Sequence, residues 1–287
     1  MSRRAADSGV VLINVLVVLA IAGGLMFLLI ATQEAALDRV ARASDAAIAE
    51  QIALGAEASV VDALRRDLDE APDLDHLQEA WARGVIQDEV ILPTGKFSVQ
   101  VVDLQAKFDV NQLAGASVVT LEFGRRLMRA LDLPPETADQ IARILGVTQG
   151  VEKLDDLGGF GVSSEALSAL APYVGALPVS GTINLNTVDP FLLAVMLQNR
   201  GQAAQLIRLR TGRGYLTLAD LNEANVIRPQ NSGLVSNAYL VVVQAQAGTA
   251  RIKMETVVVR TNLRGVKAVD ITERRFVYDR PASTDDM

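Results

Sequence analysis

The side chains that most often carry out catalysis are scarce in this sequence. It contains no cysteine, which excludes a disulfide framework, a zinc ribbon and a thiol nucleophile. His76 is the only histidine, so a His-rich metal centre and most serine-hydrolase triads are excluded as well. Carboxylates are plentiful, but no pair of them stands out as a general acid and base. We therefore expect a protein that is not an enzyme; an enzyme would need a pocket of converging polar groups that the sequence does not indicate.

The composition indicates a folded protein of one or two domains. Half of the 287 residues are hydrophobic and 21% are charged, whereas a disordered chain has low hydrophobicity and high charge. The formal net charge is -7 and the pI is about 4.9. A protein that binds the nucleic-acid backbone usually presents a basic surface, so we expect no nucleic-acid partner.

The hydrophobic residues are concentrated near the N-terminus. No charged residue occurs between Ser8 and Gln33, and a helix over residues 10–31 would span roughly 30 Å, enough to cross the bilayer core. Arg3 and Arg4 precede this run and should stay on the cytoplasmic side by the positive-inside rule. A secretory signal peptide would have a shorter apolar region followed by a small-residue cleavage site. A single membrane anchor, with the bulk of the protein outside, fits the pattern better than a signal peptide or a buried core helix.

The elements after the anchor follow from periodicity. Residues 32–68 are rich in alanine and charge, with apolar positions at helical spacing, so the membrane helix should continue as an amphipathic helix. Residues 96–103 alternate in polarity after a Pro-Thr-Gly turn and predict a strand. The pattern is helical over residues 108–236. Three further strands are expected at residues 238–246, 251–261 and 266–278.

This order predicts an α+β protein, in which a long N-terminal transmembrane and amphipathic helix packs on a small antiparallel sheet. A large all-α domain should be inserted between the first strand and the others. The expected divisions are a transmembrane helix at 10–31, an α/β domain at 32–107 and 237–279, an inserted α-helical domain at 108–236, and a flexible tail at 280–287.

The inserted domain contains two related halves, each similar to a SAM or helix-hairpin-helix unit. In both, a short Asx-containing segment opens a helical region, a helix follows, and a Leu-x-Asp-Leu segment comes last. The corresponding segments are 109–111, 138–145 and 154–157 in the first half, and 184–186, 203–210 and 218–221 in the second.

The N-terminal segment resembles a type IV prepilin-like protein, because a short basic leader ends in a glycine before an apolar helix that runs into an Ala-rich one. The resemblance implies a leader at residues 1–9, cut by a prepilin peptidase between Gly9 and Val10. Most members carry glutamate at the fifth mature position, which here is Asn14. A carboxylate in the bilayer is costly unless it is paired. In the family, this glutamate is thought to pair with the N-terminal amine of the subunit ahead of it in the fibre. An uncharged Asn14 therefore suits a subunit that has no other subunit ahead of it. Alternatively, Asn14 is a tolerated polar residue that faces a neighbouring helix.

Motifs in the rest of the chain resemble the K-type minor pseudopilins of the type II secretion system. The segment VVDLQAKFDVNQL at residues 101–113 is similar to that family's D-x-Q-G-R-F-N-x-N-x-L, and INLNT at 183–187 matches I-N-x-N-T. Further landmarks follow in family order at residues 154–160, 170–178 and 236–240. The resemblance implies the pseudopilin fold, with its inserted helical domain.

The same resemblance implies a function, a location and partners. The family caps a short periplasmic fibre, the pseudopilus, and helps to initiate its assembly and the export of proteins across the outer membrane. Its members are single-pass proteins of the bacterial inner membrane with the C-terminal domain in the periplasm. The implied partners are the I-type and J-type minor pseudopilins, the H-type and major pseudopilins, and the prepilin peptidase.

One departure concerns calcium, which the family's inserted domain binds near an acidic D-W-I-D-x-D segment. The corresponding residues 142–149 contain no carboxylate, although calcium requires about six to eight oxygen ligands. The remaining candidate ligands are Asp73, Asp75, Asp155 and Asp156, and the alternative is that they are solvated loop acids. We therefore expect no firmly bound cofactor.

A second function stays open, because residues 184–223 also resemble a helix-hairpin-helix unit that binds the DNA backbone. In such units a Gly-x-Gly hairpin offers backbone N–H groups to a phosphate. The hairpin position, residues 198–202, lacks the paired glycines, and Arg208, Arg210 and Arg213 are expected on a solvated face or against a neighbouring subunit. The alternative to the pseudopilin function is thus a membrane-anchored binding module that recruits DNA or a secreted substrate.

Overall fold

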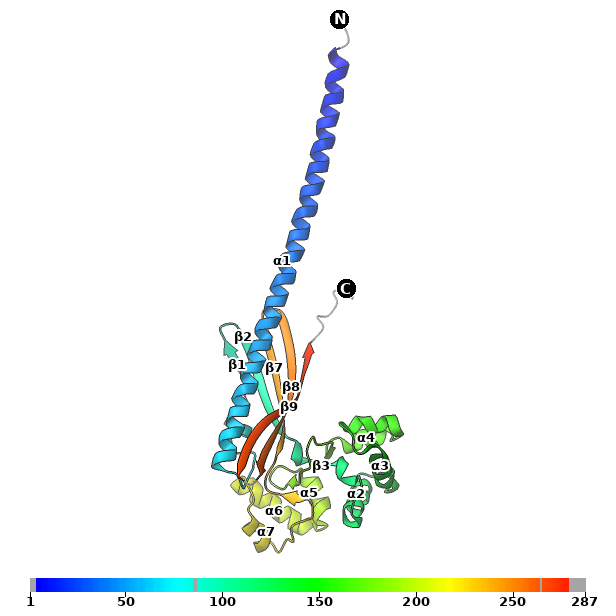
Figure 1. Ribbon diagram of the computed structural model, residues 1–287, viewed down its shortest axis with the longest axis vertical. Helices are drawn as coiled ribbons and strands as arrows, with labels where there is room; N and C mark the ends of the chain where they lie inside the picture. The colour runs from blue at the N-terminus through cyan, green and yellow to red at the C-terminus, as the bar shows by residue number, and fades with distance from the viewer. Residues whose placement is uncertain (1–3, 85–86, 264, 279–287) are drawn as a thin grey trace.

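One helix and one sheet dominate the protein, and a cluster of shorter helices is attached to one end (Figure 1). The computed structural model describes residues 4–84, 87–263 and 265–278. The predicted flexible tail at 280–287 and the first residues of the predicted leader lie outside the described residues.

Helix α1 (Arg4–Glu70) is continuous over 67 residues, as the Ala-rich sequence predicted. Its N-terminal half projects away from the rest of the molecule, and its C-terminal half packs along the sheet (Figure 1). The packed half buries alanines such as Ala49, Ala53 and Ala56, whose small side chains let the helix backbone approach the strands closely. The helix ends before Pro72, since a proline disfavours helical geometry in the residue that precedes it.

The sheet has five antiparallel strands in the order β1-β2-β7-β8-β9. The strands are β1 (Gln87–Leu92), β2 (Gly95–Asp103), β7 (Ala238–Ala247), β8 (Ala250–Leu263) and β9 (Val266–Tyr278). The expected strands β2, β7, β8 and β9 are confirmed. Strand β1 was missed, because its half-polar sequence QDEVIL does not alternate. Each of these strands reaches its neighbour by a hairpin, except for the connection from β2 to β7, which contains the helical region.

The helical region, residues 108–236, contains six α-helices, two small parallel strand pairs and short 3-10 turns. Strand β3 pairs with β4, and β5 pairs with β6. The first half contains β3 (Phe108–Asp109), η3 (Val110–Leu113), α2 (Val118–Ala130), α3 (Glu136–Thr148), η4 (Leu154–Phe160), α4 (Ser164–Leu170) and β4 (Val174–Gly175). The second contains β5 (Ile183–Asn184), α5 (Pro190–Leu197), α6 (Arg200–Arg213), α7 (Leu218–Glu223) and β6 (Ser232–Gly233).

The two halves share a set of side-chain contacts, which supports the repeat predicted from the sequence. In the first half, Asn111 accepts from the Val151 N–H (2.9 Å) and donates to the Val151 carbonyl (3.0 Å). In the second, Asn186 accepts from the Leu216 N–H (2.6 Å) and donates to the Leu216 carbonyl (3.4 Å). Each Asn satisfies both backbone groups of a distant residue, so each half closes on itself in the same way.

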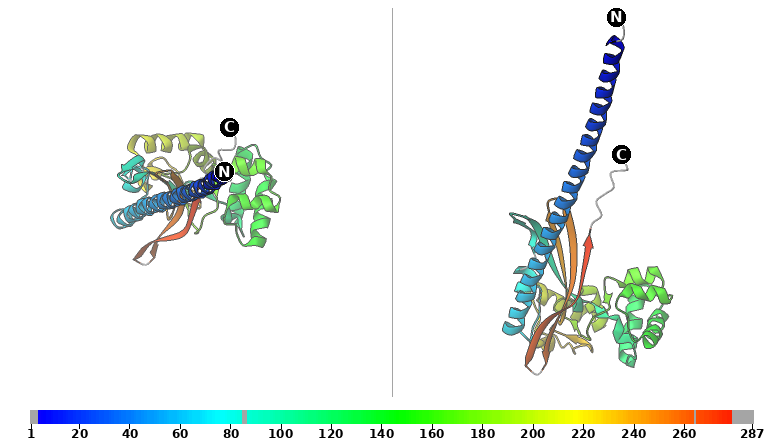
Figure 2. Two further views of the ribbon diagram at one scale, coloured as in Figure 1. Left: turned by 90° about the horizontal axis from the view of Figure 1, so that it is seen from above. Right: turned by 45° about the horizontal axis from the view of Figure 1, so that its top comes forward.

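The hydrophobic residues form two separate clusters. One joins α1 to the sheet and includes Trp81 and Tyr239; the other fills the helical region from Phe108 to Leu234. Both halves of the helical region lie at the end of the molecule opposite the N-terminus (Figures 1 and 2). The exact boundaries of the expected domains stay a prediction.

Candidate functional site

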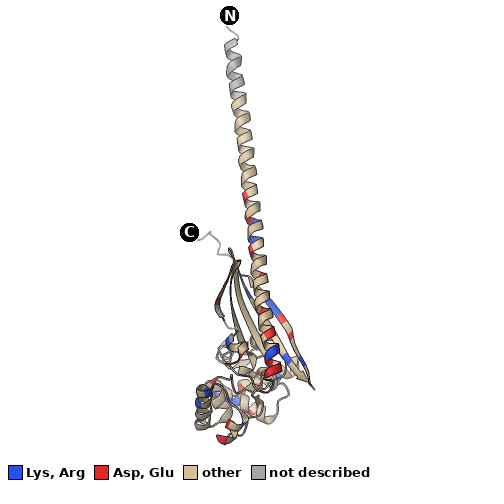
Figure 3. Ribbon diagram, turned by 90° about the vertical axis from the view of Figure 1, so that its left-hand side faces the viewer, with Lys and Arg blue, Asp and Glu red and all other residues tan. Residues whose placement is uncertain are grey.

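The first candidate site is the uncovered half of α1. Figure 3 shows that, below the turns drawn in grey, a long stretch of this helix carries no charged residue before the first acidic and basic residues appear. Within the part that the structure describes, α1 alone is long and apolar enough to cross a membrane. The most apolar stretch of this helix is not buried against any other part of the protein. Leu19, Met26 and Phe27 are all more than half exposed. Apolar side chains on this scale need a cover outside the monomer, which a bilayer or neighbouring helices would supply.

The residues of the predicted cleavage site and of the altered fifth position lie on this helix. Gly9 and Val10 are helical, and Asn14 is exposed near the start of the described side chains. The cleavage between Gly9 and Val10 and the role of Asn14 stay predictions.

The second candidate site is a buried polar cluster where α1, the sheet and the helical region meet. Its centre is Arg260 of β8, whose side chain is 1% exposed. The guanidinium donates to the carboxylate of Asp67 near the end of α1 (2.5 Å), to that of Asp75, and to the Ser236 carbonyl (2.8 Å). A charge this deeply buried is tolerated only when it is paired, so these contacts determine how α1 ends against β8.

Asp75 connects the loop after α1 to the segment that returns from the helical region. Besides Arg260, it accepts from the Ser236 N–H (2.7 Å) and from the Tyr239 hydroxyl (3.1 Å). Its backbone carbonyl accepts from the Asn184 side chain (3.1 Å), which belongs to the second helical half. One loop residue therefore contacts both the sheet and the inserted region.

Asp103, the last residue of β2, extends the cluster on the other side. Its carboxylate accepts from the hydroxyls of Ser236 (2.6 Å) and Thr187 (2.5 Å). Asn184 donates to the Ser236 hydroxyl (2.8 Å), which completes the connection. Both points where the chain passes between the sheet and the helical region are thus joined by buried hydrogen bonds, so the two parts are held in one orientation.

Glu79 lies beside this cluster and is held by its own set of contacts. It accepts from the Trp81 indole (2.7 Å) and from the His76 N–H (3.0 Å), and the imidazole of His76 stacks on the Tyr215 ring at 4.8 Å. His76 is half-buried, because it bridges the loop after α1 and the helical region. Trp81 is fully buried.

Burial changes the protonation of the cluster. It raises the pKa of Glu79 to about 7, and it raises that of Asp67 to about 6 even though Arg260 opposes the shift. Burial also raises the pKa of Asp103. Burial penalises the charged form of these carboxyl groups more than the nearby cation favours it, so Glu79 and Asp67 take up protons as the pH falls through about 7 and about 6.

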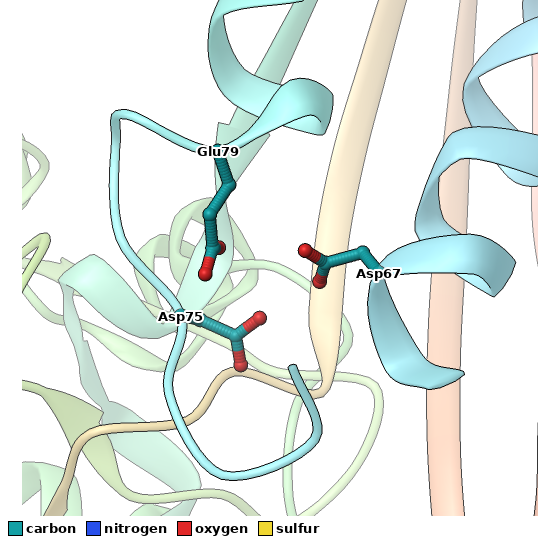
Figure 4. Close-up of side chains that lie close together, drawn as sticks. All are labelled: Asp67, Asp75 and Glu79. Carbon is teal, nitrogen blue, oxygen red and sulfur yellow. The ribbon is translucent and has the colours of Figure 1, made fainter. Parts of the chain in front are cut away.

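The same cluster is the place where a cation could be expected. Oxygens of Asp67, Asp75 and Glu79 lie within 4.8 Å of one another and point toward a common centre (Figure 4). However, the Arg260 guanidinium already contacts two of the three carboxylates. A metal ion would have to displace it into a buried position without a partner, so these residues do not fit a metal site.

The structure does not gather the four sequence-predicted calcium candidates. Asp75 belongs to the Arg260 cluster, whereas Asp73 and Asp155 are exposed. Asp156 accepts from the Lys153 N–H (2.8 Å) and caps η4, as Asp220 caps α7 by accepting from the Thr217 N–H (2.6 Å). Calcium binding at these residues stays an untested prediction.

The arginines considered for DNA binding make different contacts. Arg210 was expected on a solvated face or against a neighbouring subunit; it is instead half-buried and donates to the carbonyls of Leu185 (2.9 Å) and Val188 (2.8 Å). Arg213 pairs with Asp220. Two of the three arginines therefore stabilise the second half of the helical region, which weakens the helix-hairpin-helix alternative.

Sequence reasoning missed Arg260, the centre of the cluster. The alternation along β8 could have indicated it. One face of this strand, the face that α1 covers, carries Ile252, Met254, Thr256, Val258 and Arg260. A charged residue on a face predicted to be buried requires a buried partner. The sequence could not identify Asp67 as that partner, because 193 residues separate the two.

Two comparisons relate the chain to known proteins, although no family model matches it. It is 27% identical to type II secretion system protein K of Pseudomonas aeruginosa over 273 residues, which cover 82% of each chain. Its fold matches a chain in the crystal structure of the GspK-GspI-GspJ complex of the enterotoxigenic Escherichia coli type 2 secretion system. That match has a TM-score of 0.60 and 18% identity, and it covers 80% of this chain and 95% of the other. The predicted α+β pseudopilin fold is confirmed, and sequence and fold together relate this chain to the K-type minor pseudopilins of type II secretion systems.

Proposed function

We propose that the chain forms the tip of a periplasmic pseudopilus, where it helps to initiate fibre assembly and protein export across the outer membrane. The apolar half of α1 holds the subunit in the bacterial inner membrane and then packs into the fibre core. The sheet and the helical region lie in the periplasm.

The position of the helical region is the observation that supports this role. Both helical halves lie toward the end of the molecule opposite the N-terminus; α5 to α7 lie beyond the C-terminal end of α1, and α2 to α4 lie to one side of it (Figure 1). If the α1 helices of several subunits pack in parallel, α5 to α7 lie above their own helix, where the next subunit would otherwise be added. The buried Arg260 and Asp103 contacts hold them there.

Asn14 agrees with the same role. A subunit at the tip has no neighbour ahead whose N-terminal amine could pair with a carboxylate at the fifth mature position. An uncharged side chain avoids the cost of an unpaired charge in the membrane.

The partners follow from the related complex, whose other components are GspI and GspJ. We propose that I-type and J-type minor pseudopilins assemble with this chain, that the H-type and major pseudopilins follow below, and that a prepilin peptidase first cuts between Gly9 and Val10. None of these partners is a nucleic acid.

Electron microscopy of assembled fibres, with an antibody fragment bound to the helical region, tests the tip position. The fragment should mark one end of each fibre only. Labels along the shaft, or subunits stacked above the label, would contradict a capping role.

N-terminal sequencing of the protein from membranes tests its processing. A mature chain that starts at Val10 agrees with the proposal. An intact Met1, or a cut beyond Ala31, contradicts it.

A further inference from the structure

A small cavity lies between the two halves of the helical region. Its volume is about 160 Å³, and its apolar wall includes Phe108 and Phe123 from the first half and Ile183 and Met196 from the second. An apolar cavity of roughly 150 Å³ is large enough to bind one benzene molecule. The cavity therefore has room for one ring or one branched aliphatic group.

Arg126 lines this cavity and differs from the other arginines of α2. Arg125 pairs with Asp139 (2.6 Å) and Arg129 pairs with Glu122 (2.5 Å). Among the described residues, Arg126 has no ion-pair partner, and its buried Nε has no hydrogen-bond acceptor. Its guanidinium carbon lies 5.7 Å from the centre of the Phe123 ring. A partly desolvated guanidinium with unused donors is well suited to bind an anion.

The polar side of the cavity is held in place by contacts between the halves. Asn231 has a left-handed backbone (φ 59°), and its side-chain amide donates to the Thr120 hydroxyl (3.3 Å) across the cavity. Gln198, which also lines the cavity, has a left-handed backbone as well (φ 54°). The left-handed conformation of Gln198 ends α5, and asparagine adopts this conformation readily, so ordinary local geometry places both residues at the cavity.

We propose that this cavity binds a small apolar carboxylate, with the ring or branched chain between the two halves and the carboxylate on Arg126. The planar guanidinium can bind a carboxylate through two parallel hydrogen bonds. Arg126 is the only charged residue among the described residues that line the cavity, which matches a singly charged group, and the apolar wall favours a hydrocarbon body. A free organic acid and the C-terminal residue of a partner peptide share this chemistry.

A fluorine NMR titration of para-fluorophenylacetate with the full-length protein in detergent tests the site. We expect saturable binding that weakens by at least about tenfold in Arg126→Gln, since a charge-assisted contact is lost. The matched control Arg129→Gln removes a surface charge from the same helix and should change the affinity by less than about twofold. The neutral para-fluorophenylacetamide should bind at least about tenfold more weakly than the acid.

A second variant, Val119→Phe, tests the cavity itself. Val119 lines the cavity and is 53% exposed, so a larger side chain can fill the space without disturbing the core. Binding should be lost while the melting temperature is unchanged. Equal binding of acid and amide, equal binding to wild type and Arg126→Gln, or no saturable binding to the wild type would each overturn the proposal.

Two peptides distinguish the sources of the carboxylate. Both end in phenylalanine, one with a free C-terminal carboxylate and the other amidated. Tighter binding of the free-carboxylate peptide than of para-fluorophenylacetate identifies a peptide terminus as the ligand. Binding of para-fluorophenylacetate, with neither peptide binding, identifies a free organic acid.

Discussion

The two halves of α1 belong to one continuous helix but meet different surroundings. The N-terminal half is the more apolar, yet its large side chains are uncovered. The C-terminal half carries more charge, yet it buries Ala49, Ala53, Val60 and Leu64 against the sheet. Hydrophobicity alone therefore does not decide what this protein buries within itself. The C-terminal half is buried because its alanines fit closely against strands, whereas the N-terminal half needs a partner that the monomer lacks.

Among these substitutions, loss of the Arg260 charge should reduce the stability of the protein most, because Arg260 holds the C-terminal half of α1 against the sheet. Arg260→Met leaves the carboxylates of Asp67 and Asp75 buried without a cation, which should lower the free energy of unfolding by about 3 to 5 kcal/mol. Urea unfolding of the full-length protein in detergent, followed by the fluorescence of Trp81, measures the change. Arg251→Met on the exposed part of the same strand is the control and should change stability by less than about 0.5 kcal/mol. Equal effects of the two variants would contradict the role of the cluster.

A single substitution placed in each half compares the two directly. Ala53 is fully buried against the sheet, so Ala53→Leu should destabilise the protein by about 1 to 3 kcal/mol through overpacking. Ala36 lies in the uncovered part of the same helix. Ala36→Leu should leave the stability almost unchanged, because alanine and leucine have similar helix propensities. Thermal unfolding followed by circular dichroism gives both values. A melting temperature unchanged in Ala53→Leu would show that α1 is not tightly packed there.

The free energy of unfolding of the protein should also depend on pH, through Glu79 and Asp67. Both pKa values are raised in the folded protein, to about 7 and about 6, so the native state holds protons that the unfolded chain releases. The stabilisation is fully present below the ordinary pKa values, and it is lost as the pH rises from about 5 through 7. Urea unfolding at pH 5 and pH 8 should therefore give the higher stability at pH 5.

The variant Glu79→Gln assigns part of this dependence. The amide can still accept from the Trp81 indole, but it does not titrate, so stability should change less between pH 5 and pH 8 than in the wild type. The Asp67 contribution should remain. An unchanged slope would show that Glu79 is not protonated in the native protein.

The smallest effect on folding is expected for Asn14→Glu. Asn14 is exposed on the uncovered half and distant from both hydrophobic clusters, so the melting temperature of the folded part should stay the same. A clear decrease, measured by circular dichroism in detergent, would mean that the two halves of the helix are energetically coupled.

Much of the fold could be predicted from the sequence, because the signals are local. The strand at residues 266–278 was predicted at its observed bounds, and the long helix was predicted to end close to Glu70. Strand β1 could not be predicted, because it forms by pairing with β2 rather than from its own pattern. The repeat was predicted from the order of its segments, but the matching contacts of Asn111 and Asn186 became visible only in three dimensions.

The sequence by itself determined the apolar N-terminal helix, the nature of the main elements and the resemblance to K-type minor pseudopilins. These features depend on residues that are neighbours in the chain or that repeat with a short period. Only the tertiary structure decided that Arg260 meets Asp67 and Asp75, that His76 stacks on Tyr215, and that Arg126 has no ion-pair partner among the described residues. Such contacts join residues far apart in sequence, and burial, which follows from the packing of the whole chain, decides what each charge costs and therefore which partner it needs.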